Sequence, residues 1–244
     1  MNIKIMYYSL LLLLLSSTTA CRDEQRWIKG EGNNVSNTRM PAPFTGISLS
    51  MDADVEVYRD SVFRIELTGQ QNILNVLETK VSGNTLSIGY SWRTVVRKHN
   101  PVTIRIYMPV VSSIDISGSG SIACRDGFDV ETLHTNVSGS GNITYDGAVR
   151  NSFHANVSGS GSITNNGNNA CRSASYTISG SGNIYAEWLR AEDADAHVSG
   201  SGDQRIHATR TLDAHISGSG DILYRGRPAV NSHISGSGKV IAIQ

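Results

Sequence analysis

Apolar and polar residues alternate along the second half of the chain in a unit that occurs seven times. The spacings between units are 21, 20, 21, 20, 18 and 18 residues. Each unit contains an aliphatic residue followed by Ser-Gly-Ser-Gly, beginning at Ile116, Val137, Val157, Ile178, Val198, Ile216 and Ile234. Six units place Ile or Val six residues after the first aliphatic residue, whereas the fifth has Gln204 there. Self-similarity at such a period is typical of a repeat architecture.

Within each unit the apolar residues have a period of two, which predicts strands and not helices. Even positions before the first aliphatic residue are apolar or small, as at Leu133 and Phe153, and odd positions are polar, as at Asn136 and His215. One unit cannot bury its own apolar face, so the copies are expected to stack. The predicted fold class is therefore all-β: a parallel β-helix of seven Ser-Gly-Ser-Gly coils over residues 114–244. The glycines are expected on the inward side of each bend.

Residues 44–113 show strand alternation without the repeat, with turn signals between the apolar runs. We expect irregular β coils or a small sheet that covers the N-terminal edge of the column. Residues 44–244 would then form one continuous domain. Residues 21–43 contain Gly, Asn and two prolines, which indicates a tether.

The first twenty residues have the pattern of a secretory signal peptide. Lys4 is followed by an uncharged stretch with six consecutive leucines and then by small residues, and Cys21 comes next. This arrangement is similar to a bacterial lipobox, in which the cysteine is lipidated, although Thr18 stands where leucine is usual. Ordinary secretion with an incidental Cys21 is the alternative. Either reading predicts export from the cytoplasm, and the first predicts an outer-membrane lipoprotein of the cell envelope, either periplasmic or surface-exposed.

Charge and cysteine content argue against two classes of protein, those that bind nucleic acid and those held together by disulfides. Lys plus Arg equals Asp plus Glu at 21 each, so no net field favours nucleic acid or an anionic membrane. Besides Cys21 only Cys124 and Cys171 are present, and they lie in different columns of the predicted stack. We therefore expect two buried free thiols and no disulfide framework.

Several segments together resemble a known family. These are Lys29–Gly32, Phe44–Ile47, the strand ending at Ile88, the strand from Val102 to Pro109, and the tandem Ser-Gly-Ser-Gly copies. They resemble the head GIN domain family, whose members are described as "putative auto-transporter adhesins" and are common as lipoproteins of Bacteroidetes-type bacteria. The resemblance implies a right-handed β-helix related in shape to pectin lyases, without a recognised catalytic set.

The segment between Tyr90 and Asn100 is the strongest candidate for ligand binding. It holds Trp92, Arg93, Arg97 and Lys98 between two predicted strands. An exposed aromatic ring among basic groups can stack on a sugar or hold an acidic glycan, and long loops are often functional. An ordinary surface hairpin is the simpler alternative.

Stacking would also turn repeated polar residues into arrays. Two parallel ladders of serine are expected on the outside, which suit local hydrogen bonding or, as a sharper hypothesis, a hydroxyl surface for polysaccharide or ice. The position before the aliphatic residue holds His197, His215 and His233, near Asp195 and Asp213. These are weak candidates for a divalent metal site. A solvated polar face is the favoured interpretation, so no metal or other cofactor is predicted.

Signals for catalysis are few. No nucleophile elbow, metal-protease helix or phosphate loop is present, and only Asp203 and Asp221, with Arg205 and Lys239 nearby, approach a cluster of charges. A calcium-binding β-roll would need aspartate in every copy, which this chain lacks. The sequence thus predicts a non-catalytic envelope lipoprotein that acts as a surface binding or adhesion module. Its expected partners are a membrane, reached through the lipid, and a polysaccharide or another surface protein.

Two alternatives stay open at this point. The chain could be a polysaccharide-active enzyme of pectin-lyase-like shape, or a purely structural envelope protein. The run Lys239–Gln244 offers little to protect a final coil, since Ile241 and Ile243 are apolar. We therefore also expect that the C-terminal edge pairs with a second copy or with a strand of a partner.

Overall fold

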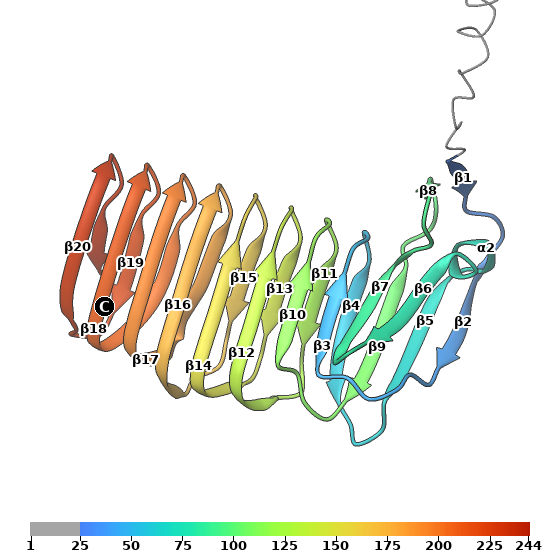
Figure 1. The fold of residues 1–244 in the computed structure, drawn as a ribbon, viewed down its shortest axis with the longest axis horizontal. Helices are drawn as coiled ribbons and strands as arrows, with labels where there is room; N and C mark the ends of the chain where they lie inside the picture. The colour runs from blue at the N-terminus through green and yellow to red at the C-terminus, as the bar shows by residue number, and fades with distance from the viewer. Residues whose placement is uncertain (1–24) are drawn as a thin grey trace, which may run out of the picture.

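The computed structural model describes residues 25–244, which form a β-solenoid (Figure 1). The expected signal peptide and Cys21 lie outside the described residues. Nineteen of the strands belong to one sheet that winds along the solenoid. The predicted all-β solenoid is confirmed.

Two parallel walls of strands form the repeat region. The first wall contains β10 (Ser113–Ile116), β12 (Asp129–Val137), β14 (Ala148–Val157), β16 (Ala170–Gly180) and β20 (Ala229–Gly236). The second contains β11 (Ser121–Cys124), β13 (Asn142–Tyr145), β15 (Ser162–Asn165), β19 (Ile222–Arg225) and β21 (Val240–Ala242). The long strands β17 (Asn183–Gly200) and β18 (Gln204–Gly218) bend and contribute to both walls.

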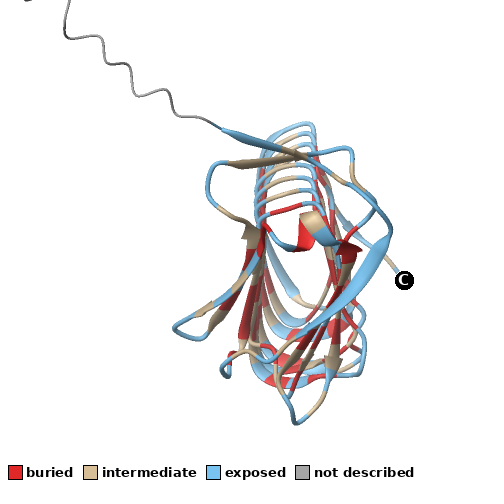
Figure 2. Ribbon diagram, turned by 90° about the vertical axis from the view of Figure 1, so that its right-hand side faces the viewer, coloured by how far each residue is buried: buried red, intermediate tan, exposed pale blue. Residues whose placement is uncertain are grey.

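Neighbouring turns pair in parallel and in register, as the repeat predicts. The first aliphatic residues lie in one column, in which each is the partner of the next: Ile116, Val137, Val157, Ile178, Val198, Ile216 and Ile234. All but the last of them are buried. Seen from the N-terminal end, buried residues line the inside of the coil and exposed residues its outside (Figure 2).

Two further rungs precede the repeats, but their spatial order differs from their order in the sequence. The strands β3 (Gly46–Leu49) and β4 (Asp54–Arg59) pair with β10 and β11 on one side. On their other side they pair with β7 (Thr85–Tyr90) and β9 (Thr103–Met108). The chain therefore leaves the stack after β4, adds a rung at the end, and returns to the opposite side of β3 and β4.

Antiparallel strands close this end of the solenoid. Strand β5 (Arg64–Gln70) pairs with β9 and β2 (Asn34–Arg39), and β6 (Leu77–Ser82) pairs with β7. The short helix α2 (Gln71–Leu74) buries Ile73 and Leu74 beside them. A separate two-stranded sheet is formed by β1 (Arg26–Lys29) and β8 (Thr94–Arg97). Both β1 and β2 lie within the segment that the sequence suggested was a tether.

The glycine columns have a different cause from the one that the sequence suggested. A Cβ atom on Gly180 would lie 2.4 Å from the carbonyl oxygen of Gly159 on the preceding rung. It would therefore point along the stack at the neighbouring backbone, and not into the interior. Gly180 also has a φ of 147°, a conformation that other residues rarely adopt. Glycine is required by the close approach of successive rungs.

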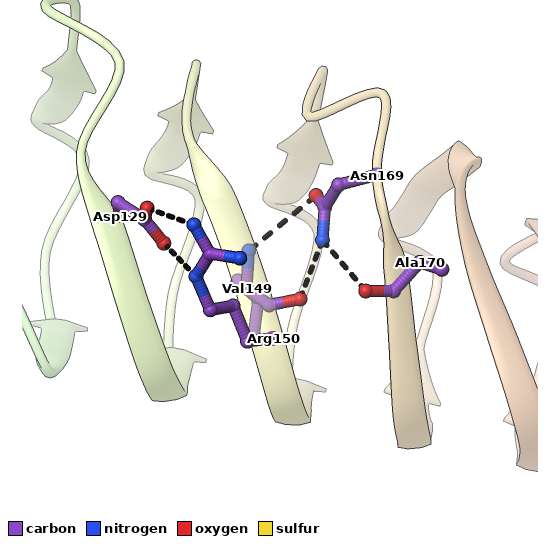
Figure 3. Close-up of polar contacts among 5 residues, drawn as sticks. All are labelled: Asp129, Val149, Arg150, Asn169 and Ala170. Carbon is purple, nitrogen blue, oxygen red and sulfur yellow. Dashed lines mark hydrogen bonds and ion pairs between the residues drawn. The ribbon is translucent and has the colours of Figure 1, made fainter.

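Side chains complete the hydrogen bonding where the backbone ladders shift. Asn169 donates from Nδ2 to the carbonyl oxygens of Val149 (2.6 Å) and Ala170 (3.0 Å), and its Oδ1 accepts from the Val149 N–H (3.4 Å). On the same rung as Val149, Arg150 forms a bidentate ion pair with Asp129 (Figure 3). Gln204, the exception in the aliphatic column, is fully buried and donates to the carbonyl oxygen of His197 (2.9 Å).

Candidate functional site

The sequence-predicted ligand segment forms half of a small projection, which we call the knob and define as residues 26–29 and 91–98. Strands β1 and β8 run parallel within it, so that Trp27 lies beside Val95 and Lys29 beside Arg97. Because strand side chains alternate, Ile28 and Val96 pack toward the core while these four residues share the opposite face. The knob lies at the end of the long axis opposite β20 (Figure 1).

Both tryptophans of the knob are exposed, and an arginine guanidinium lies against one face of each ring. Trp92 is 82% exposed and Trp27 is 53% exposed. The guanidinium of Arg93 lies 3.9 Å from the ring centroid of Trp92, and that of Arg97 lies 3.9 Å from the ring centroid of Trp27. Such cation–π pairs hold the cation and the ring together at an exposed surface. A hollow of about 380 Å³ lies against Trp27, Lys29 and Arg97.

Side-chain amides fix the knob to the closed end of the solenoid. Gln70 donates to the carbonyl oxygen of Gly32 (2.9 Å) and accepts from the Asn100 N–H (2.9 Å). Asn72, on α2, donates to the carbonyl oxygen of Lys29 (2.7 Å) and accepts from the Glu31 N–H (3.1 Å). These hydrogen bonds therefore hold the chain at the end of β1 and just after β8.

Backbone strain is concentrated in the same place. Among residues 25–244, Arg93 and Lys98 are the only non-glycine residues with positive φ, at 62° and 47°. Such conformations cost of order 1 kcal/mol or more and cluster at functional sites. Here they stand at the two ends of β8 and carry two of the knob's cations.

A second candidate surface is a groove over the C-terminal turns, and sequence reasoning did not identify it. It has a volume of about 510 Å³ and runs across four rungs, between the histidine column and one serine ladder. His197, His215 and His233 line one side, and Ser199, Ser217 and Ser235 line the other. All fourteen serines of the two ladders are exposed.

The three histidines stack instead of converging on one point. Ring centroids are 4.7 Å apart for His197 and His215, and 5.7 Å apart for His215 and His233. Imidazole nitrogens bind metals in the plane of the ring, so parallel rings direct their lone pairs side by side. In the part of the chain that the structure describes, no group of three or more His, Cys, Asp or Glu residues is arranged to hold a metal.

Polar partners surround both histidine stacks. His197 Nε2 lies 2.8 Å from Asp195 Oδ1, and Asn231 donates to Asp213 (2.9 Å). A second stack, of His134 on His154, has a centroid distance of 4.6 Å. Burial lowers the pKa of His154, and the neighbouring imidazole of His134 lowers it further. These contacts are typical of a solvated polar face.

The acidic residues that might have suggested catalysis have a structural role. Asp203 accepts the N–H of Asp221 (2.8 Å), and Asp221 accepts the N–H of Lys239 (2.8 Å). Asn183 accepts the N–H of Asp203 in the same way (3.0 Å). Each side chain thus bonds to the backbone of the next rung, and the column acts as a ladder along the stack.

The two cysteines of the described chain are free and buried. Burial raises the pKa of the Cys171 thiol to about 11, with a smaller contribution from Glu192. Burial also raises the pKa of the Cys124 thiol. Both thiols are therefore protonated at neutral pH and poorly suited to nucleophilic chemistry.

The last rung, formed by β20 and β21, is open on its outer side. Strand β20 pairs only with β18 and β21 pairs only with β19, among the residues that the structure describes. Val230, Ile234 and Ile241 are exposed there. No helix between residues 25 and 244 is long and apolar enough to cross a membrane.

Comparisons with known proteins agree on fold and family. Residues 43–228 match the model of a family described as "Putative auto-transporter adhesin, head GIN domain". A solved "putative adhesin" from Bacteroides fragilis is 23% identical and superposes with a TM-score of 0.81, covering 88% of this chain and 100% of that one. No curated protein matches the chain.

Two further solved structures have the same shape. A "Putative lipid binding protein" from Parabacteroides distasonis is 26% identical with a TM-score of 0.74, covering 90% of this chain and all of that one. A "putative adhesin" from Parabacteroides merdae is 20% identical with a TM-score of 0.69 over 90% of this chain and all of that one. None of these descriptions is that of an enzyme.

Proposed function

Because the chain belongs to the head GIN domain family, we propose that it is a non-catalytic surface-binding module of the cell envelope whose solenoid wall binds an extended polymer such as a polysaccharide. The groove between the histidine column and the serine ladder carries this proposal. Its lining repeats at the rung spacing of about 4.8 Å. A linear polymer lying along the groove would meet the same imidazole and hydroxyl groups on successive rungs, and several weak contacts on one ligand add up to useful affinity.

A glycan array screened with the exported chain tests this function. A polysaccharide that binds should lose most of its affinity in the variant His215→Ala with Ser217→Ala, since both residues line the groove. Ser138→Ala and Ser140→Ala change one serine of each ladder on a rung outside the groove and should leave binding intact. Equal loss in both variants would argue against the groove as the binding surface.

Anchoring through a lipid on Cys21 is the second part of the proposal. It rests on the lipobox-like sequence, and the lipid-binding description of the Parabacteroides distasonis structure agrees with a role at lipid. Cys21→Ser should move the protein from the membrane fraction to the soluble exported fraction. Unchanged fractionation would contradict lipidation at this residue.

The competing enzymatic function has its own test. If Asp203 or Asp221 were catalytic, the substitutions Asp203→Asn and Asp221→Asn would abolish cleavage of a polysaccharide that the array identifies. We expect no cleavage by the unmodified chain, because both carboxylates accept backbone hydrogen bonds from the next rung.

A further inference from the structure

The knob combines features that a polymer-binding groove does not need. Five cations stand on its two segments and no carboxylate does, the cations being Arg26, Lys29, Arg93, Arg97 and Lys98. In the sequence, Glu31 follows Lys29 by two residues and Glu24 precedes Arg26 by two. Asp52 and Asp54 share a neighbouring hollow with Lys98. The two segments of the knob themselves therefore carry only positive charges, although the whole chain is neutral.

Exposed tryptophan beside arginine and lysine is the composition of protein surfaces at the membrane–water boundary. Trp92 has the largest exposed fraction of any large apolar side chain in the described chain. It stands in a turn closed by the Thr94 N–H on the Ser91 carbonyl oxygen (3.0 Å), with Arg93 next to it in the left-handed conformation. The strained backbone thus holds an apolar ring and a cation together at the tip.

A lipid surface explains this geometry better than a sugar does. A sugar stacks on an aromatic face, and a guanidinium already occupies one of the two faces of each knob tryptophan. The same pairing suits lipid, since the ring enters the headgroup region while the cation meets phosphate.

The short distance in sequence between Cys21 and the knob also supports contact with a lipid surface. Cys21 precedes Arg26 by five residues, which span at most about 17 Å when extended. A lipid on Cys21 would therefore hold β1 within that distance of the membrane.

We propose that the knob is a membrane-contact surface that docks on an anionic phospholipid leaflet, with Trp27 and Trp92 in the headgroup region and Arg97 and Lys98 on lipid phosphates. This inference rests on the lipid anchor of the proposed function and assigns the anchor a second contact. A single acyl chain binds membranes only marginally, and a basic or aromatic patch is the usual second signal. The side-chain amide of Asn72 donates to the Lys29 carbonyl oxygen, and that of Gln70 donates to the Gly32 carbonyl oxygen just beyond the knob. These hydrogen bonds would fix the orientation of the solenoid relative to the docked knob.

Vesicle binding by the exported chain with Cys21→Ser tests the knob without the lipid. The probes are vesicles of equimolar phosphatidylglycerol and phosphatidylethanolamine, compared with phosphatidylcholine alone. We expect sedimentation with the anionic vesicles only, weakened by salt. Arg97→Gln and Lys98→Gln should each weaken binding about fivefold, in line with the usual contribution of one cation at an anionic leaflet.

Tryptophan emission locates the contact. The chain has three tryptophans, so Trp188→Phe leaves only the two of the knob. Their emission should shift to shorter wavelength with anionic vesicles, and Trp92→Ala should reduce both the shift and the binding.

The pair Trp188 and Arg225 provides a matched control. Their ring and guanidinium are 4.5 Å apart, and Trp188 is also exposed, but the pair lies on the repeat region. Trp188→Ala and Arg225→Gln should leave vesicle binding unchanged. Thermal unfolding of each variant would verify that its fold is retained.

The proposal would be overturned by absence of vesicle binding, by equal losses in the knob and control variants, or by binding of an anionic polysaccharide in place of vesicles. Failure of the anchor itself is distinguishable. It would show as unchanged fractionation of the Cys21→Ser chain in cells, whereas the vesicle experiment does not depend on lipidation.

Discussion

At the scale of single residues, the aliphatic column that lies six residues after the first one stabilises the stack of repeats. Ile143 is buried between Ile122 and Ile163 on the neighbouring rungs. Ile143→Asp should destabilise the protein by several kcal/mol, because a carboxylate would be buried without a partner. Ser140→Ala, on an exposed ladder, should change the free energy of unfolding by no more than about 0.5 kcal/mol. Urea unfolding of both variants measures the difference, and similar midpoints would contradict the inward and outward assignment.

The buried thiols make a prediction about alkaline pH. The pKa of Cys171 rises from 9.0 to about 11 on folding, because burial disfavours the thiolate. Below pH 9 the thiol is protonated in both states. Between pH 9 and 11 only the unfolded chain ionises, so stability is lost as pH rises through that window. The loss from this residue should be on the order of 2 kcal/mol, and Cys171→Ala should reduce the alkaline slope of the unfolding free energy. An unchanged slope would show that the thiol ionises equally in both states.

At the scale of elements, Asn169 replaces missing backbone pairing between β14 and β16. Its three hydrogen bonds to Val149 and Ala170 have no substitute in Asn169→Ala, which should cost about 1–3 kcal/mol. The adjacent Asn168 is an exposed control with one hydrogen bond, from Arg190 (3.0 Å), and Asn168→Ala should cost no more than about 0.5 kcal/mol. Chemical unfolding would separate the two, and equal effects would contradict the structural role of Asn169.

The repeat elements could be predicted from sequence because periodicity supplies their register. Once Ile116 and Val137 are recognised as equivalent positions of two repeats, the partner of every other residue in the coil follows by counting along the chain. Residues 44–113 have the same alternation but no equivalent positions, so the sequence could not place β3 and β4 between β7 and β10. It also could not predict that a Cβ atom on Gly180 would clash with a carbonyl oxygen of the preceding rung, since that contact exists only between stacked backbones.

The candidate site was predicted only in part, for the same reason. Trp92, Arg97 and Lys98 were identifiable from one short segment. Their partner Trp27 lies about seventy residues earlier, and only the parallel pairing of β1 with β8 brings it to Arg97. The groove was not predicted, although its histidine column was. The groove spans four rungs, and the residues of one repeat do not show how the surfaces of stacked repeats combine.

At the scale of the whole molecule, the two ends of the solenoid differ. One end is closed by antiparallel strands, whereas the other exposes the backbone edge and apolar side chains of the β20–β21 rung. We expect two copies to pair through this edge at high concentration, which sedimentation of residues 21–244 with Cys21→Ser measures. Ile234→Lys or deletion of residues 240–244 should abolish the association. Val35→Lys, on the exposed edge strand β2 at the other end, should not. A monomer at every concentration would exclude self-pairing and leave a strand of another protein as the expected partner.

The stacking of near-identical turns also has an evolutionary consequence. Each turn takes 18–21 residues and bonds only to the turns on either side, so one duplication or loss of a repeat in the gene lengthens or shortens the molecule by about 4.8 Å. Neither the closed end with its knob nor the final rung is altered by such an event. The distance between the two ends is therefore a heritable quantity that changes in small, equal steps, while the chemistry of each end can evolve separately.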